Sequence, residues 1–336
     1  MFSLSVRSFL YSLCLSAVAV SAAPGLSLSL SGADSVVDVE NLNVAATLTN
    51  TGDATLKILN DPSSILSSKF ATHTFDISSD NGSPAFTGVK VNHACVFFFV
   101  LSRLMSTDSS LVGTAYNFTG SGEASYSIEP SSLFYYVDPD TNELASINAD
   151  TQQHTAKISG TLAVARRSNL GKRISYNGCT SSRQTTLVSA AAAAQTYAQG
   201  SYDYLSSHTA STTRYVTWFG TYTSARHSTV LSHYSNMLAH PYADYEYDCT
   251  CTESDVYAYV YPSEFGTIYL CSVFWQTTTT GTDSRGGTLI HESSHFTIIG
   301  STDDYVYGQS AAKSLASSNP SEAIENADNH EYFAEK

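Results

Sequence analysis

Alternation of hydrophobic and polar residues dominates the first half of the chain and gives way to helical patterns in the second half. Short apolar runs, several of them alternating with polar positions, are separated by Gly, Asn, Asp and Pro; they include residues 26–30, 44–49, 89–91 and 161–164. Runs of this kind, bounded by turn residues, are typical of antiparallel strands. We therefore expect residues 23–174 to form an all-β, sandwich-like unit.

Longer helical patterns follow from residue 175 onward. Residues 185–206 contain an alanine-rich stretch, and alanine has the highest intrinsic helix propensity. The later patterns predict a second helix at 218–238, a hairpin or small sheet at 245–274 and one or two helices at 303–333. Residues 175–336 are thus expected to form an α+β unit that is mainly helical.

The N-terminus carries the pattern of a secretory signal. Residues 1–22 combine an early Arg7 with an apolar stretch at 9–20 and small residues after it. No later apolar run is long enough to span a membrane. Two dibasic pairs, Arg166-Arg167 and Lys172-Arg173, stand just before residue 175 and predict processing there. We expect a secreted protein, with no membrane partner, in which residues 23–174 are a propeptide and residues 175–336 the mature part.

Candidate catalytic chemistry is concentrated in His291-Glu292-Ser293-Ser294-His295. On a helix, positions i and i+4 lie on one face, so both imidazoles can reach a single metal ion. A catalytic zinc takes three protein ligands and a water, and a Glu after the first His can accept the proton of that water. The flanking residues 287–290 and 296–299 are mostly apolar, which predicts a buried helix that continues past the motif.

The third metal ligand is not given by this motif. One large group of proteases continues with a Gly and a third His, but Ile298 and Ser301 stand at those positions. Glu322 and Glu325 could act from a second helix downstream. A closer carboxylate is Asp304, brought back to the metal if Gly300 ends the motif helix. Asp303 competes with Asp304 on spacing alone.

The segment from Ser301 to Gly308 resembles the second motif of the deuterolysin-type aspzincin metalloendopeptidases, G-T-x-D-x-x-Y-G. Thr302, Asp304, Tyr307 and Gly308 match it in register. The resemblance implies one Zn²⁺ per chain held by His291, His295 and Asp304. It implies Glu292 as general base and Tyr307 as hydrogen-bond donor to the developing oxyanion. Ser301 stands where the family usually has Gly, so a positive φ there would carry some strain.

A narrower resemblance covers residues 175–336. Blocks that are similar to the fungal peptidyl-Lys metalloendopeptidases occur in order at 175–179, 215–220, 248–251, 259–262 and 326–333. This implies a zincin-like fold and hydrolysis of peptide bonds on the N-terminal side of lysine. It also implies that Asp328 and Glu331 form the lysine pocket, and residues three apart do share one helix face.

Four cysteines remain in the predicted mature part: Cys179, Cys249, Cys251 and Cys271. Four cysteines allow three pairings, and Cys249 is too close to Cys251 in an extended segment for those two to pair comfortably. The family resemblance implies the pairs Cys179–Cys249 and Cys251–Cys271. Such bridges are typical of an oxidising compartment.

The net charge of the predicted mature part indicates which kinds of partner it can bind. Residues 175–336 contain sixteen acidic and six basic residues, a balance of −10. An acidic enzyme is a poor binder of nucleic acid but attracts cationic substrates. We expect lysine-containing proteins and peptides as substrates, the propeptide as an inhibitor, and a monomer. A broad-specificity deuterolysin-like endopeptidase, and a secreted binding protein without activity on the same scaffold, remain as alternatives.

Overall fold

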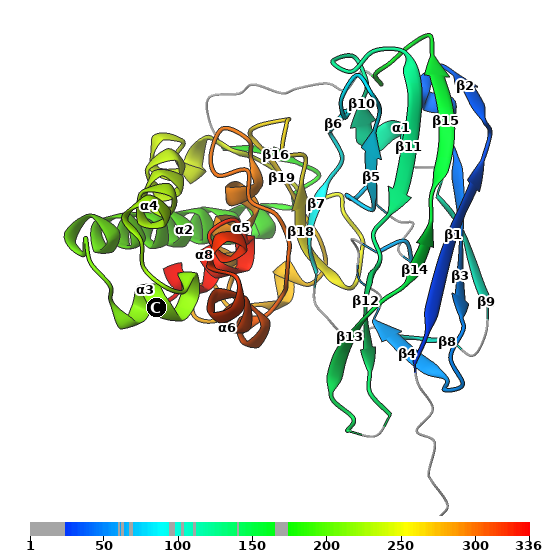
Figure 1. Ribbon diagram of the computed structural model, residues 1–336. Helices are drawn as coiled ribbons and strands as arrows, with labels where there is room; N and C mark the ends of the chain where they lie inside the picture. The colour runs from blue at the N-terminus through cyan, green and yellow to red at the C-terminus, as the bar shows by residue number, and fades with distance from the viewer. Residues whose placement is uncertain are drawn as a thin grey trace, which may run out of the picture.

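The computed structural model describes residues 24–59, 61, 64–66, 70–93, 98–101, 104–109, 112–139, 141–164 and 174–336. A β-rich region formed by residues 24–164 lies beside a mainly helical region formed by residues 174–336 (Figure 1). Each region has its own large hydrophobic core, and the chain passes from one core to the other between Leu162 and Ile174. The predicted signal peptide and both dibasic pairs lie outside the described residues.

The β-rich region is built from three four-stranded sheets and a two-stranded one, with orders β14-β1-β3-β9, β2-β15-β11-β5, β13-β12-β4-β8 and β10-β6. The strands of these sheets are β1 (Leu26–Gly32), β2 (Ser35–Val37), β3 (Val44–Asn50), β4 (Leu56–Leu59), β5 (Phe75–Ser78), β6 (Ala85–Phe86), β8 (Phe98–Leu101), β9 (Leu104–Ser109), β10 (Tyr116–Asn117), β11 (Ala124–Pro130), β12 (Leu133–Val137), β13 (Leu144–Asn148), β14 (Asp150–Gln152) and β15 (His154–Ser159).

Alternation explains the central strands of this region. Leu26, Leu28 and Leu30 of β1 are buried while the residues between them are half-buried, because successive side chains of a strand point to opposite faces. Two short helical turns, η1 (Val39–Asn41) and α1 (Val112–Ala115), interrupt the strands. Residues 161–164, predicted as a strand, are irregular. They are an extension after β15 in which Leu162 packs on the core and its carbonyl accepts from the Phe118 N–H.

The helical region places its helices around the metal-motif helix α5. Its helices are α2 (Ser181–Ser207), α3 (Thr213–Phe219), α4 (Ser224–Ala239), α5 (Arg285–His295), α6 (Gln309–Ser318), α7 (Pro320–Ala323) and α8 (Ala327–Ala334), with 3₁₀ turns η2 (Tyr242–Asp244) and η3 (Phe274–Gln276). Its strands are β16 (Ser175–Asn177), β17 (Glu246–Asp248), β18 (Val256–Val260) and β19 (Thr267–Leu270). The prediction of a fold that combines helices and sheets is thus confirmed, and α5 packs between α2 and α8.

Two helix boundaries differ from the sequence prediction. The helix expected at 218–238 is divided into α3 and α4, because Gly220 has φ 71° and a Cβ at that position would collide with the carbonyl oxygen of Ala316. The motif helix was expected to continue to Gly300, but α5 ends at His295 with Phe296 as its C-cap. The apolar residues after the motif, including Phe296 and Ile299, are buried outside the helix instead.

One strand of the β-rich half of the chain belongs to the sheet of the helical region. Strand β7 (Lys90–His93) pairs antiparallel with β18 and completes the sheet β16-β17-β19-β18-β7. In Figure 1 it lies between the two regions, beside β18. Residues 89–91 were predicted to be a strand of the sandwich. The strand forms, but its ladder partner is β18, more than 160 residues further along the chain.

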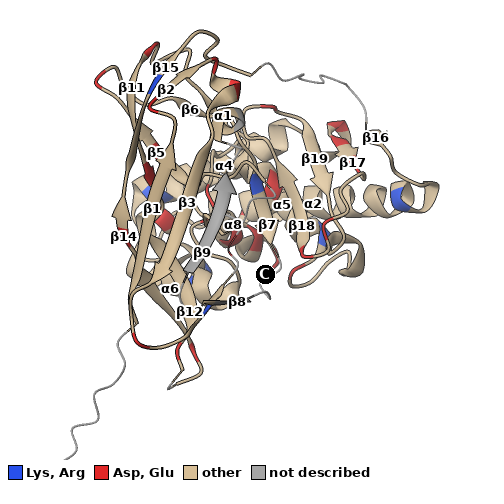
Figure 2. Ribbon diagram, turned by 90° about the vertical axis from the view of Figure 1, so that its right-hand side faces the viewer, with Lys and Arg blue, Asp and Glu red and all other residues tan. Residues whose placement is uncertain are grey.

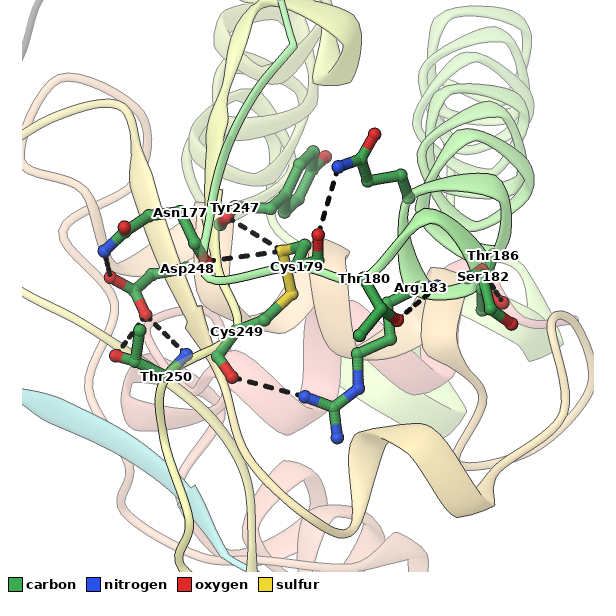
Figure 3. The surroundings of a disulfide bond; sticks show 11 residues. Asn177, Cys179, Thr180, Ser182, Arg183, Thr186, Tyr247, Asp248, Cys249 and Thr250 are labelled. Atoms are coloured by element: carbon green, nitrogen blue, oxygen red, sulfur yellow. Dashed lines mark hydrogen bonds between the residues drawn. A yellow bond between two sulfur atoms is a disulfide. The ribbon is translucent and has the colours of Figure 1, made fainter.

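Both disulfide pairings implied by the family resemblance are present. Cys179–Cys249 closes a sequence separation of 70 residues and Cys251–Cys271 one of 20. Figure 3 shows the first bridge, where Arg183 donates from its guanidinium to the Cys249 carbonyl oxygen at 3.3 Å. This bridge ties the segment before α2 to the end of β17. In the part of the chain that the structure describes, no helix is long and apolar enough to cross a membrane.

Candidate metal centre

Helix α5 carries the motif through the centre of the helical region. Ser284 caps its N-terminus by accepting a hydrogen bond from the Gly287 N–H at 3.0 Å. Ten of its eleven residues are buried, including both histidines and Glu292. A helix buried on all sides does not need a polar stripe for solvation. Its polar residues are therefore candidates for function.

Three buried side chains converge at the end of this helix. The Nε2 atoms of His291 and His295 lie 3.1 and 3.4 Å from Oδ1 of Asp304. Among the described residues, none of these three atoms has a hydrogen-bond partner. Buried polar atoms without partners are costly, and three converging donor atoms of the N, N, O type are a ligand set that zinc accepts. The residues present therefore fit a Zn²⁺ ion.

The second ring nitrogen of each histidine is held by an oxygen. Nδ1 of His295 donates to the carbonyl oxygen of Thr302 at 2.9 Å. Nδ1 of His291 lies 2.8 Å from Oδ1 of Asp328. An oxygen at Nδ1 keeps the proton there and leaves the Nε2 lone pair free for a metal. Asp328 thus orients His291, and this is a role that sequence reasoning did not assign to it.

A sharp turn after α5 brings Asp304 back to the histidines. Ser301 adopts φ 53°, as the family's glycine at that position suggests, and the Thr302 N–H donates to the Ser294 carbonyl oxygen at 3.2 Å. Asp304 is buried, which raises the pKa of its carboxyl, but the adjacent imidazoles outweigh burial and the pKa is lowered overall. Asp304 is therefore an anion that is ready to bind a cation.

The competing carboxylates lie elsewhere. Asp303 Oδ1 accepts from the Asp304 N–H at 2.8 Å and forms an ion pair with Lys90. Neither Glu322 nor Glu325 belongs to a group of potential metal ligands among the described residues. The geometry thus favours Asp304 over these three alternatives.

Glu292 is fully buried beside the histidines. In the part of the chain that the structure describes, neither of its carboxylate oxygens has a hydrogen-bond partner. Burial raises the pKa of this carboxyl well above its ordinary value, although the neighbouring His291 opposes the shift. A carboxyl with a raised pKa can both accept and return a proton, which is what a general base in peptide hydrolysis must do.

An acidic cavity of about 300 Å³ adjoins the metal centre. Its lining contains three carboxylates and no Lys or Arg: the acidic residues are Asp283, Asp328 and Glu331. In Figure 2 acidic positions gather where α5 and α8 meet, close to this site. Burial and the charge of Asp328 raise the pKa of Glu331, and Oε2 of Glu331 lies 3.6 Å from Nδ1 of His291. A cation entering this cavity would relieve the repulsion among its carboxylates.

The two predicted pocket residues differ in their bonding. The second oxygen of Asp328 accepts from the Gly308 N–H at 2.5 Å, so both of its oxygens are engaged within the protein. Glu331 accepts no such backbone hydrogen bond in the described part of the chain. Of the pair, Glu331 is thus the more available partner for a ligand.

Tyr307 lies at the mouth of this cavity. Its hydroxyl donates to the carbonyl oxygen of Val91 at 2.7 Å, so it already holds a peptide carbonyl of strand β7. A tyrosine hydroxyl at this place can donate to a carbonyl oxygen on which negative charge develops.

Sequence reasoning missed Asp283 and the pairing of strand β7 with β18. Asp283 lines the cavity, has φ 51° and accepts from the Tyr332 hydroxyl at 2.6 Å. Its position directly before the N-cap of α5 is a signal that could have drawn attention to it. The pairing of β7 with β18 offered no local signal, because it is set by tertiary structure alone.

Comparisons with known proteins agree with this geometry. Residues 204–335 match the aspzincin family, described as lysine-specific metallo-endopeptidase. The peptidyl-Lys metalloendopeptidase of Armillaria mellea is 86% identical, over 100% of this chain and 98% of its own length. That of Grifola frondosa is 51% identical over 95% of each chain.

Among solved structures, a zinc peptidase from Grifola frondosa is 60% identical; the match covers 47% of this chain and 96% of that chain, with a TM-score of 0.46. The full-length similarity to the Armillaria and Grifola enzymes and the matched family together decide the assignment. The chain belongs to the aspzincin family of lysine-specific metallo-endopeptidases and is a zinc metallo-endopeptidase.

Proposed function

We propose that the chain is the secreted precursor of an endopeptidase that hydrolyses the peptide bond on the N-terminal side of lysine. The observation that carries this proposal is the acidic cavity beside the metal centre, whose described lining includes Asp283, Asp328 and Glu331 and no Lys or Arg. The relatives from Armillaria and Grifola bear the name peptidyl-Lys metalloendopeptidase, which agrees with it.

The cavity suits lysine for electrostatic reasons. A lysine ammonium that leaves water loses a large hydration energy, which must be returned by carboxylates and hydrogen bonds. Glu331 supplies a buried carboxyl whose pKa is raised by burial and by Asp328, so an incoming ammonium stabilises its ionised form. The compact ammonium needs less room than the planar guanidinium of arginine. Three tyrosines, Tyr257, Tyr307 and Tyr332, also line this cavity.

We assign the metal-binding role to His291, His295 and Asp304. Zn²⁺ bound at their three free atoms supplies Lewis-acid polarisation of the scissile carbonyl and lowers the pKa of water. Glu292 takes the proton of the attacking water and delivers it to the leaving amine. Tyr307 donates its hydroxyl hydrogen to the carbonyl oxygen as charge develops there. Asp328 holds His291 in position, while Glu331 binds the lysine ammonium.

The division of the chain supports a precursor. We propose that residues 1–22 are a signal peptide, that residues 23–174 are a β-sandwich-like propeptide, and that residues 175–336 are a monomeric zincin-like catalytic domain. Leu162 packs against the core of the β-rich region and Ile174 against the core of the helical region, which supports a boundary between them. Two disulfides in the catalytic part suit an extracellular enzyme. The contacts of β7 with Tyr307 and Asp303 support a propeptide that inhibits the enzyme.

Digestion of a denatured protein mixture tests the substrate preference. The processed enzyme should generate peptides whose new N-terminal residue is lysine, and the Glu292→Gln variant should generate almost none. Termini spread over many residue types would instead favour the alternative, a broad-specificity deuterolysin-like endopeptidase. N-terminal sequencing of the active form tests the precursor: a start near Ser175 is expected, and a start near Ala23 would contradict the division.

A further inference from the structure

Strand β7 leaves the β-rich region and lies in the active-site groove of the catalytic domain. In the described structure its only ladder partner is β18, with Tyr259 opposite Val91 and Ala258 opposite Asn92. All four of its residues are buried. Val91 packs with Val256 and Cys271 in a small hydrophobic cluster that joins the two regions. An extended segment added to a sheet edge is a common way to bind a peptide.

Polar contacts fix this strand at three points. Lys90 forms an ion pair with Asp303, the neighbour of the proposed ligand Asp304. The Val91 carbonyl oxygen accepts from the Tyr307 hydroxyl at 2.7 Å. Nε2 of His93 lies 3.3 Å from Oδ2 of Asp255. These contacts hold three of the four residues of β7 against the helical region.

The contacts of β7 resemble those expected of a peptide substrate on either side of its scissile bond. Tyr307, whose proposed role is to donate to the scissile carbonyl, donates here to the carbonyl of Val91. The next residue, Asn92, lines the acidic cavity where a substrate lysine would bind. Lys90 and Asn92 lie two positions apart, so their side chains leave the strand on the same side; Lys90 meets Asp303 there and Asn92 lines the acidic cavity. The Val91–Asn92 bond thus occupies the place of the scissile bond.

We propose that β7 is the inhibitory segment of the precursor, and that it binds as a peptide substrate in which Asn92 replaces the required lysine. This inference rests on the proposed lysine specificity. Asn92 fills the mouth of the cavity with a neutral amide and so brings no charge for Glu331. The one lysine of the strand, Lys90, is directed to Asp303 instead. The segment therefore blocks the groove without being a good substrate for the enzyme that it blocks.

The first test replaces Asn92 with lysine, the residue that a substrate is proposed to carry after its scissile bond. In the Asn92→Lys precursor, water should hydrolyse the bond after Val91: its hydroxyl joins the Val91 carbonyl carbon, and a proton goes to the released amine. The precursor is purified before any processing near residue 175. Its mass spectrum should then show a chain that begins at position 92, in at least half of the molecules. The same substitution combined with Glu292→Gln should leave the chain intact. The Asn43→Lys precursor, with a lysine added at an exposed site of the β-rich region, should also stay intact.

The second test loosens the strand without altering the scissile position. Lys90→Ala removes the ion pair with Asp303, so residues 256–260 of β18 should exchange their amide hydrogens at least tenfold faster. The turnover of a lysine-containing peptide by the uncut precursor should rise by a similar factor. Lys157→Ala, which removes an exposed lysine from β15, is the matched control and should change neither value. Hydrogen exchange is read without turnover, so it reports on the strand even in the Glu292→Gln background.

The two proposals fail in different ways. If the processed wild-type enzyme does not cut before lysine, the proposed function is wrong. If it does cut before lysine, while the folded Asn92→Lys precursor stays whole and Lys90→Ala leaves exchange at β18 unchanged, then β7 is not the inhibitory segment. Cleavage after Val91 that depends on Glu292 would establish the inference.

Discussion

Asp328 lies 2.8 Å from Nδ1 of His291 through one carboxylate oxygen and accepts the Gly308 N–H at 2.5 Å through the other. It thereby links the motif helix α5 to the start of α6, and the metal centre to the acidic cavity. The family resemblance alone had placed Asp328 in the lysine pocket with Glu331. The structure gives it a second task, because the orientation of a metal-binding imidazole depends on the partner of its other nitrogen.

Replacing Asp328 should therefore weaken metal binding. Loss of such a partner typically lowers metal affinity by roughly 10- to 100-fold, and we expect that range for Asp328→Ala in the processed enzyme. Glu331→Ala is the matched control, since Glu331 is 3.6 Å from the same nitrogen and should leave zinc affinity within about threefold of wild type. Competition with a zinc chelator measures both. Equal affinities for the two variants would show that Asp328 does not orient His291.

Three variants separate the ligand from the base. Glu292→Gln should keep zinc but lose turnover by roughly 10²–10⁴-fold or more, because it removes the proton acceptor and no ligand. Asp304→Ala should lose zinc affinity. Asp303→Ala should keep it in the processed enzyme, because Asp303 belongs to neither group of potential metal ligands among the described residues. Zinc content after dialysis and peptide turnover are the measurements, and zinc loss in Asp303→Ala alone would reverse the assignment.

The two disulfides should differ in their effect on stability. Loss of a crosslink increases the entropy of the unfolded chain by an amount that grows with the loop it closes. The model of loop entropy gives about 3 kcal/mol for the 20-residue separation of Cys251–Cys271 and about 4 kcal/mol for the 70-residue separation of Cys179–Cys249. Paired Cys→Ser variants in the Glu292→Gln background avoid self-digestion during urea unfolding. If removal of Cys251–Cys271 lowered the free energy of unfolding more than removal of Cys179–Cys249, strain or packing would outweigh loop entropy.

A buried histidine pair should make the processed enzyme sensitive to acid. Nδ1 of His233 lies 3.0 Å from Nε2 of His330, whose Nδ1 donates to the Asn326 carbonyl oxygen at 3.0 Å. Burial lowers the pKa of His233 to about 4 and that of His330 to about 3. Near pH 6 these histidines bind protons in the unfolded state but not in the folded state. The stability that the neutral histidine pair provides is therefore complete above about pH 6.5 and is lost as the pH falls toward 4.

The size of this effect follows from the displacement of the pKa. One unit corresponds to about 1.4 kcal/mol, so His233 alone accounts for on the order of 3 kcal/mol between pH 7 and pH 4. The free energy of unfolding of the Glu292→Gln enzyme, measured by urea from pH 7 to 4.5, should fall along this course. His233→Gln should flatten it. A curve of unchanged slope in that variant would assign the acid sensitivity to other groups.

Local patterns in the sequence were enough for much of the site, and non-local pairing explains what they missed. The spacing of His291 and His295 fixes their common helix face, and the turn with Ser301 at φ 53° brings Asp304 to them. Both features lie within a few residues, so periodicity and a family motif predict them. The helix break at Gly220 depends on a close approach by Ala316, and the placement of β7 depends on β18. No pattern near residues 90–93 encodes that partner, so the strand was assigned to the wrong sheet.

The central claim is that the acidic cavity selects lysine through Glu331. The most direct test measures kcat/KM for peptides that differ only in Lys or Ala after the scissile bond, with the processed wild-type enzyme and Glu331→Gln. A hydrogen bond to a charged group contributes about 1.5–3 kcal/mol, so we predict that the preference for Lys falls roughly 10- to 100-fold while the Ala peptide is cut at an unchanged rate. An undiminished preference for Lys in a variant with full zinc content would contradict the account.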